Sequence, residues 1–367
     1  MISRAALAVL IAASLSALLA LLALSSCADL EPLGADGPQD ASSGAPREHP
    51  LAAVGTLVGD ELPEAPLGPP YPIILVHGFS GWDDLGPLDY FFQVKDALEQ
   101  DGDDVTTPAL PPYDTSQDRA VALARVIDEV LARTHKAKVH LIGHSQGGID
   151  IRVVTATLGY ADKIASITTV STPHDGTAVA DLAAAAPAGV LNPAGQLLAW
   201  MLGLGGSSPE DTGSDSFTPD LAASIASLTP AAEEALVAHN PIPATIPFFT
   251  VAGVSNLRSL DNPECAASLW SNSDRVDDTD PILAATGTYL STHDAGVIDT
   301  VLHPVPNDGL VTVASARAPG SIFLGCVPAD HFDEIGQVAD LIPDLISGWD
   351  HVDFYRKLVA NARTTER

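Results

Sequence analysis

The fold is decided by ten residues, VHLIGHSQGG at 139–148. Residues 139–142 form a mostly apolar run that is typical of a buried strand. Glycine occupies positions 143, 147 and 148, and apolar residues at helical spacing follow as far as 158. The stretch therefore predicts a strand, a very sharp turn and a helix, with Ser145 at the tip of the turn.

Ser145 lies two residues from a glycine on each side. In a turn this sharp, a side chain at Gly143 or Gly147 would collide with the neighbouring strand or helix. The turn lifts the serine hydroxyl clear of the sheet and places a helix N-terminus beneath it, where negative charge is stabilised. The pattern therefore predicts that Ser145 is a nucleophile. A glycine-rich turn with only a structural role is the alternative.

Outward from this stretch, apolar runs alternate with segments of helical spacing. This β-α-β-α order predicts an α/β fold with a mostly parallel central sheet and helices on both faces. Strands are expected at 73–76, 105–110, 139–142, 164–171, 248–254 and 321–324. Helices are expected at 88–100, at 147–158, at 334–346 and, capped by Ser116, at 116–135.

The composition excludes one large class of partner. The 367 residues carry a formal net charge of −30 at pH 7, and no Lys/Arg stripe offsets it. Such a charge repels phosphate backbones, so nucleic acid is excluded as a partner. Only 17% of the residues are charged and 46% are hydrophobic, which favours a folded chain.

The N-terminal residues have the pattern of an export signal. Arg4 precedes an apolar stretch at 5–24, which predicts a signal peptide over 1–26. The segment ends in Ser25-Ser26-Cys27, and a small residue before such a Cys resembles the lipobox of bacterial lipoproteins. That resemblance implies lipidation of Cys27 and anchoring to the bacterial cell envelope, at the outer membrane or in the periplasm. A secreted protein with an ordinary cleaved signal, or an uncleaved membrane span, are the alternatives.

Residues 27–69 are rich in Pro, Gly, Ala and acidic residues and show no apolar period, so they are expected to form a flexible tether before a folded domain at 70–367. If Cys27 carries lipid, Cys265 and Cys326 remain as an even pair. In an oxidising compartment one disulfide would close a loop of about 60 residues. Two buried thiols are the alternative.

Two further motifs surround the serine stretch. HGF at 77–79 follows the first expected strand, and TPH at 172–174 follows the strand after the serine. With GHSQGG at 143–148, they resemble the bacterial triacylglycerol lipases that depend on calcium and on a dedicated foldase. The resemblance covers about 71–202 and resumes at about 280–356. Asp175 departs from the pattern, because the family more often has a basic residue there.

This resemblance implies an α/β-hydrolase fold with a helical lid inserted at about 177–245. It also implies hydrolysis of lipid or other esters at an oil–water interface, and a foldase as partner. Residues 194–204 are apolar nearly all round behind Asn192-Pro193, which is typical of a lid that covers Ser145 or of a core helix. Backbone N–H groups of Phe79 and Gln146 would form the oxyanion hole. His77 is expected to shape that loop.

The acid is expected between the serine and the base in chain order. The family places it in an Asn-Asp-Gly turn, which here assigns Asp308 at 307–309. Its carboxylate would hold the tautomer of the base and stabilise the imidazolium. Asp294 and Asp299 are competitors that lack the motif.

Two segments look alike as the source of the base. His331 begins the family motif His-x-Asp-Glu-x-x-Gln at 331–337, and His351 begins a second Asp-His segment. Residues 350–356 instead resemble the last helix of the family, in which no histidine is required. The resemblance therefore assigns His331 as the base, and His351 is expected on the surface of a helix.

Calcium is the cofactor that the resemblance implies. In similar lipases, two Asp carboxylates and two backbone carbonyls hold a calcium ion that ties down the histidine loop. The matching groups are the side chains of Asp280 and Asp333 and the carbonyls of Gln337 and Leu341. These hard oxygen donors suit calcium and not zinc. A solvated acidic loop is the alternative.

The sequence thus predicts a serine ester hydrolase, in particular a triacylglycerol lipase. A short-chain esterase and a polyester depolymerase use the same site and remain alternatives. A catalytically silent, hydrolase-like binding module is the alternative from another class.

Overall fold

The computed structural model describes residues 67–79, 89–185, 221–255, 265, 279–280, 283–293, 305–337 and 348–366. All of them belong to one compact unit, Pro63–Arg367. The expected signal peptide, Cys27 and most of the tether lie outside the described residues, as do Leu341 and the apolar segment at 194–204. Among the helices that are described, none has the length and hydropathy needed to cross a bilayer.

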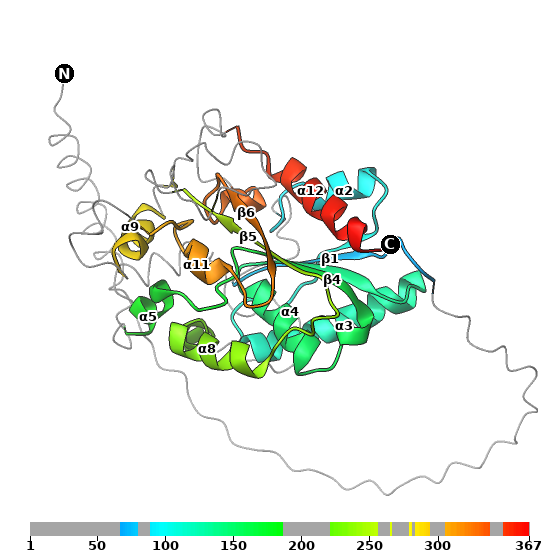
Figure 1. Ribbon diagram of the computed structural model, residues 1–367, viewed down its shortest axis with the longest axis horizontal. Coiled ribbons are helices and arrows are strands. Elements are labelled where there is room, and N and C mark those ends of the chain that lie inside the picture. Colours follow the sequence, from blue (N-terminus) through cyan, green and yellow to red (C-terminus); the bar gives the residue numbers. More distant parts are fainter. Residues whose placement is uncertain are drawn as a thin grey trace, which may run out of the picture. The chain divides into compact units, whose positions relative to one another are not determined.

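Six strands form one sheet, in the order β2-β1-β3-β4-β5-β6 (Figure 1). Every pair of neighbours is parallel. The chain winds outward in two directions from β1, so ligands are expected at the carboxyl ends of β1 and β3, where the winding reverses. The strands are β1 (Ile73–Val76), β2 (Val105–Thr106), β3 (Val139–His144), β4 (Ile164–Val170), β5 (Phe248–Gly253) and β6 (Ile322–Val327).

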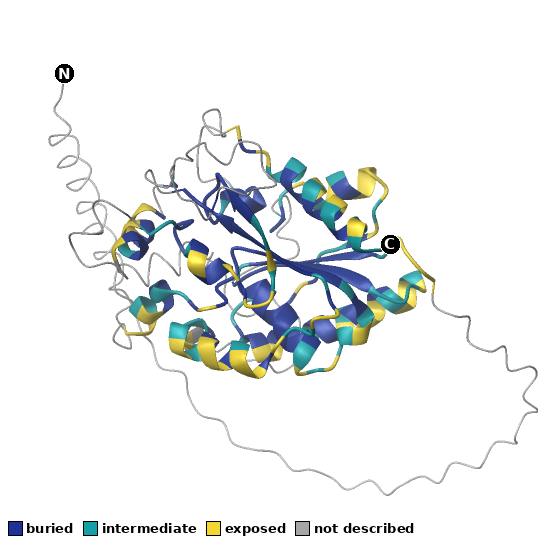
Figure 2. Cartoon of the chain, viewed as in Figure 1, coloured by how far each residue is buried: buried dark blue, intermediate teal, exposed yellow. Residues whose placement is uncertain are grey.

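Alternate residues of β1 enter two different cores. Ile73 and Leu75 pack with α2 and α12, whereas Ile74 and Val76 pack with α3 and α4 on the opposite face. All four side chains are fully buried, as expected for a continuous apolar strand in a parallel sheet. In Figure 2 the central strands are mostly buried, β6 starts with the exposed Ile322, and exposed residues gather on the outer faces of the helices.

The helices cover both faces of the sheet, as the sequence predicts (Figure 1). Beside one face lie α2 (Val94–Gln100) and α12 (His351–Arg363), and beside the other lie α3 (Ser116–Thr134), α4 (Gln146–Ala156) and α8 (Pro230–His239). The remaining described helices are α5 (Ala178–Ala184), α7 (Leu221–Ser227), α9 (Ala284–His293) and α11 (Val313–Ala316). Helices α5, α7 and α8 fall in the range expected for the lid insertion.

Three predicted element boundaries are wrong. The strand expected at 105–110 ends at Thr106, and Pro108 and Pro111 follow it; a proline has no N–H to donate to a strand ladder. The helix expected at 88–100 begins only at Val94, because Gln93 has a left-handed backbone with φ of 58°. The cap of α3 is Thr115, whose hydroxyl oxygen accepts a hydrogen bond from Asp118 N–H, and not Ser116.

The helix expected at 334–346 is also wrong at its start. Asp333–Ile335 forms a single 3-10 turn, and Gly336 then turns left-handed with φ of 72°. Gly336 is required there, since a Cβ would lie 2.3 Å from Nε2 of His351. Residues 338–347 lie outside the described part of the chain.

Candidate active site

Ser145 occupies a one-residue turn between β3 and α4. Its φ of 55° and ψ of −131° lie in a region that residues other than glycine rarely adopt. The strand runs through His144 and the helix begins at Gln146, so no loop separates them. The strained turn presents Ser145 at the carboxyl edge of the sheet.

The glycines beside Ser145 are required by close backbone contacts. A Cβ at Gly147 would lie 2.3 Å from the Val76 carbonyl oxygen, and one at Gly143 would lie 2.7 Å from the Gly148 nitrogen. Real Cβ atoms do not approach so closely, so the sequence prediction about these two positions agrees with the structure. The N-terminus of α4 therefore rests directly on the end of β1.

The loop at 77–79 lies against the nucleophile. A Cβ at Gly78 would stand 2.7 Å from Cβ of Ser145, so only glycine fits between them. Phe79 is buried, with its ring edge-on to Tyr113 at 5.9 Å between ring centroids. Since β1 and β3 are neighbours, the structure brings the backbones of Phe79 and Gln146 to adjacent strand ends.

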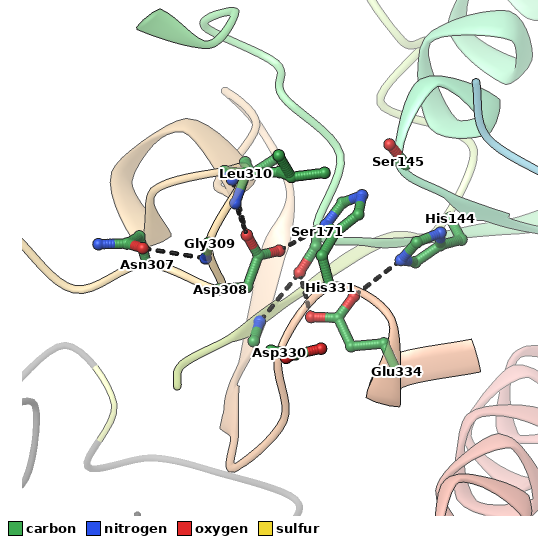
Figure 3. A network of polar contacts seen from close by, with 12 residues as sticks. His144, Ser145, Ser171, Asn307, Asp308, Gly309, Leu310, Asp330, His331 and Glu334 are labelled. Carbon is green, nitrogen blue, oxygen red and sulfur yellow. Dashed lines mark hydrogen bonds and ion pairs between the residues drawn. The ribbon is translucent and has the colours of Figure 1, made fainter. Parts of the chain in front are cut away.

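The Asp308 carboxylate and the His331 imidazole form a buried pair. Nδ1 of His331 lies 2.7 Å from Oδ2 of Asp308 (Figure 3). A carboxylate at this nitrogen holds the proton on Nδ1 and leaves Nε2 as the acceptor. The backbone joins the same two residues, because His331 N–H donates to the Asp308 carbonyl at 3.0 Å. The structure thus brings together two residues 23 positions apart.

The Asp308 side chain is fixed by its own turn. Oδ1 accepts N–H groups from Leu310 at 2.8 Å and Val311 at 2.7 Å. Asn307 accepts the Gly309 N–H in the same way. Gly309 has φ of 97°, which explains why glycine follows the acid. The fully buried carboxylate is therefore oriented before any substrate arrives. The competitors Asp294 and Asp299 lie outside the described residues.

A second polar network lies behind the imidazole of His331. The rings of His144 and His331 are in contact, with 4.5 Å between their centroids and a tilt of 45° between their planes. Its Nδ1 lies 2.8 Å from the Tyr90 hydroxyl, and its Nε2 lies 2.9 Å from Oε2 of Glu334. The Ser171 hydroxyl donates to the other Glu334 oxygen. None of Tyr90, Glu334 and Ser171 is predicted from the sequence as a site residue, although Glu334 lies inside the motif at 331–337.

Burial controls the charges in this network. It lowers the pKa of His144 well below its usual value, and the neighbouring His331 lowers it further. Burial raises the pKa of Glu334 well above its usual value, and the charge of Asp308 adds to this. Potential metal-ligating atoms of His144, His331 and Glu334 lie within 4.8 Å of one another. Each of these side chains already has a hydrogen-bond partner in the protein, so the cluster is explained without a metal ion.

Three buried aspartates gather beside the His331 loop. The Asp330 carboxylate accepts the N–H of Asp280 at 2.8 Å and the N–H of Asp333 at 3.1 Å. Burial raises the pKa of Asp330 to about 6, and these N–H donors oppose the rise. The structure therefore brings Asp280 and Asp333 to one side chain. Their buried carboxylates are the hard oxygen donors that calcium requires.

Two further assignments can be compared with the structure. The side-chain amide of Gln337 donates to the backbone carbonyls of Asp89 and Tyr90, which ties the end of the motif to the segment before α2. His351 lies in the last helix as expected but is half-buried, with Nε2 donating to the Phe92 carbonyl at 2.9 Å. His351 thus keeps part of its side chain exposed, while its ring contacts the segment before α2.

The disulfide between Cys265 and Cys326 is present. It spans 61 positions and joins β6 to a residue of the connection that follows β5, with 4.9 Å between the Cα atoms. Both residues are buried in the core that also contains Leu310 and Val311. The bridge therefore supports the half of the site that holds Asp308.

Residues 71–202 match the family model described as the alpha/beta hydrolase fold. A triacylglycerol lipase of Vibrio cholerae is 41% identical over 112 residues, which are 30% of this chain and 35% of that protein. A triacylglycerol lipase of Pseudomonas fragi is 38% identical over 111 residues, 30% of this chain and 37% of that protein. The chain thus spans about a third of the length of these curated relatives.

Solved structures are similar over a larger part of the chain. The mature form of a Bacillus licheniformis lipase gives a TM-score of 0.53 at 22% identity, covering 80% of this chain and 94% of that one. The Staphylococcus hyicus lipase gives 0.55 at 20% identity, covering 84% and 99%. Similarity at this level of identity shows the architecture. The chain has the α/β-hydrolase fold.

Proposed function

We propose that this protein is a serine ester hydrolase, and specifically a triacylglycerol lipase. The observation that carries the proposal is the buried His331–Asp308 pair at 2.7 Å, at the same edge of the sheet as a serine in a strained turn. Three groups of this kind suit acyl transfer, because a serine hydroxyl is a weak nucleophile until a base removes its proton.

In the proposed mechanism, Ser145 Oγ attacks the carbonyl carbon of the ester while Nε2 of His331 takes the hydroxyl proton. The Asp308 carboxylate stabilises the imidazolium that forms. His331 then gives the proton to the departing alkoxide, which leaves an acyl group on Ser145. Water, deprotonated by the same imidazole, hydrolyses this acyl-enzyme.

The tetrahedral intermediate carries a negative oxygen that needs donors. The backbone N–H groups of Phe79 and Gln146 are the proposed donors, because they follow the ends of neighbouring strands beside Ser145. The N-terminus of α4 adds its positive end to the same place.

The names of the relatives support a triacylglycerol as substrate. The same serine site would serve a short-chain esterase or a polyester depolymerase, and profiling of acyl chain length separates these activities. A lipase is expected to accelerate when tributyrin exceeds its solubility limit. A lid at 194–204 and a foldase partner are proposed on the family resemblance alone.

We also propose that calcium binds at Asp280 and Asp333, together with the carbonyls of Gln337 and Leu341. Bound there, the ion would supply positive charge to buried carboxylates and hold the His331 loop in place. Lipidation at Cys27, with anchoring to the cell envelope, is a separate proposal. Radiolabelled palmitate should label the protein, and should not label Cys27→Ser.

The test of the central proposal is a fluorophosphonate probe, which reacts only with an activated serine. The protein should be labelled and should hydrolyse p-nitrophenyl esters, and Ser145→Ala should do neither while keeping its unfolding temperature. Ser321→Ala is a matched control, because Ser321 precedes β6 at the opposite edge of the sheet. Near-full activity in Ser145→Ala would overturn the assignment.

A further inference from the structure

We propose that His77 and Arg119 are positioning residues that fix the direction of the Phe79 N–H, the expected oxyanion donor. The proposal rests on the proposed function, since it concerns how that site is built. The contacts that carry it link four parts of the fold: the loop after β1, the segment that follows β2, the helix α3 and the helix α4 that follows the nucleophile.

The expected donor, the Phe79 N–H, shares its peptide unit with the carbonyl of Gly78. The carbonyl of Gly78 and the N–H of Phe79 belong to one planar trans unit, in which they point in opposite directions. Nδ1 of His77 lies 2.8 Å from the Gly78 oxygen. A hydrogen bond that holds this oxygen therefore also sets the direction in which the Phe79 N–H points.

The hydrogen-bond partners of His77 determine which of its ring nitrogens carries the proton. The Leu110 N–H donates to Nε2 at 3.0 Å, so Nε2 is the acceptor and the proton resides on Nδ1. This is the tautomer that donates to the Gly78 oxygen. Burial and, secondarily, the charge of Arg119 lower the pKa of His77 to about 3, so the ring stays neutral in this arrangement.

The side chain of Arg119 is fully buried and contacts the same loop. Nη2 donates to the His77 carbonyl at 2.6 Å, and Nη1 donates to the Pro111 carbonyl at 2.7 Å. Nε pairs with Asp150 of α4 at 2.8 Å. One rigid guanidinium therefore ties the oxyanion loop to the helix that begins beside Ser145.

Gly78 explains why such support is needed. Cβ of Ser145 and the Tyr90 hydroxyl would each lie 2.7 Å from a Cβ at this position, so no side chain of its own can restrict the loop. Glycine is also the residue with the most backbone freedom. The contact from His77 opposes the rotation of the peptide between Gly78 and Phe79 that would turn the N–H away from the nucleophile.

Two substitutions separate the two hydrogen bonds of His77. His77→Asn places an amide N–H near the position of Nδ1 and keeps the bond to the Gly78 oxygen. His77→Gln places an amide oxygen near Nε2 and keeps only the bond from Leu110. If the donor to Gly78 matters, His77→Gln should lose about 100- to 1,000-fold in kcat, with KM little changed, and His77→Asn should retain much more.

A boronic acid inhibitor gives a second readout, because it forms a tetrahedral adduct on the serine that uses the same donors. Its affinity for His77→Gln should fall in step with kcat/KM, whereas unfolding temperatures of the two variants should be similar. Equal kcat in both variants, or losses that simply follow the unfolding temperature, would overturn the proposal.

Arg119→Lys keeps the experiment decisive if His77→Gln does not fold. The lysine preserves the positive charge beside Asp150 but not the fork that reaches His77, so kcat should fall about tenfold with KM unchanged. An unchanged kcat would count against the proposal. Failure of the parent protein to react with a fluorophosphonate would instead refute the serine hydrolase assignment itself.

Discussion

The two halves of the site are built in different ways. The nucleophile half is continuous in sequence: β3, Ser145 and α4 follow one another, and backbone contacts at Gly143 and Gly147 leave no room for change. The base half brings Asp308 and His331 together from two loops, and hydrogen bonds hold them. Close backbone packing therefore fixes the Ser145 turn, with the buried Arg119–Asp150 pair behind it, whereas polar contacts, a disulfide and buried acids fix the base half.

This difference teaches which perturbations each half should resist. Backbone packing at the Ser145 turn is insensitive to pH and to metal removal, so a pH response of the nucleophile half should come from its buried polar residues. In the base half, the buried carboxylates depend on their donors and counter-charges. The two halves are therefore expected to respond separately to substitution, chelation and pH.

The largest effect is expected from Asp308→Asn. An amide cannot hold the His331 tautomer that accepts the serine proton, so kcat should fall by about 10⁴-fold. The fold and the nucleophile half should be unchanged, which circular dichroism would check. A loss below tenfold would show that another group orients His331.

Removal of the disulfide should destabilise the base half next. Replacing Cys265 and Cys326 together by Ser frees the connection between β5 and β6 and should cost about 4 kcal/mol in the free energy of unfolding. Hydrogen exchange should increase around Asp308 before it increases in β3. Uniform loosening of both regions would contradict the division into halves.

The nucleophile half should respond most to the buried ion pair of Arg119 and Asp150, in which both side chains are fully buried. Asp150→Asn leaves an unpaired buried charge and should cost about 3 kcal/mol in urea unfolding. The double variant Arg119→Met/Asp150→Leu is the control, and it should recover part of that loss. If it recovers nothing, the cost comes from packing.

Calcium chelation should affect only the base half. Removing the ion should lower the free energy of unfolding by about 2.7 kcal/mol when calcium was present at 100 times its dissociation constant. Asp280→Asn should make the protein indifferent to chelator. A chelator effect that persists in this variant would place the ion elsewhere.

The effect expected to be smallest near neutral pH is a pH dependence that belongs to the nucleophile half. His77 has a pKa of about 3 in the fold and about 6.5 when unfolded. Between these values only the unfolded chain binds the proton, so stability is lost as pH falls from 6.5 towards 3, at up to about 1.4 kcal/mol per pH unit. In His77→Asn that contribution should vanish. Urea unfolding at several pH values between 7 and 4 would show a flatter curve, and an unchanged slope would contradict the burial argument.

The sequence predicts the nucleophile half better than the base half, and the reason is physical. Apolar runs and glycine contacts act over a few residues, so β1, β3 and the turn at Ser145 follow from local pattern. The pairing of Asp308 with His331 depends on tertiary contacts, which leave no local pattern. It could be predicted only from the family motifs that contain these two residues. The Tyr90–His144–Glu334 network left no periodic signal, since its members come from three separate elements.

The left-handed residues mark the other misses. Gln93 delays the start of α2, and Gly336 ends the 3-10 turn after His331. A glycine within a helical pattern is a weak local sign that the helix ends there. A glutamine gives no such sign, although Gln93 adopts φ of 58°. Tertiary packing selects such conformations against the preference of the residue.

The register of the sheet has a consequence for the two proposed oxyanion donors. Val76 pairs with Gly143, so the donors follow neighbouring strands that backbone hydrogen bonds hold side by side. Adjacent strands lie about 4.8 Å apart in any sheet, whatever their side chains. The separation of the two strand ends from which the proposed donors extend is thus set by main-chain hydrogen bonds and does not depend on side chains. Substitutions around the site can change the direction of each donor, but they leave unchanged the strand spacing from which both donors extend.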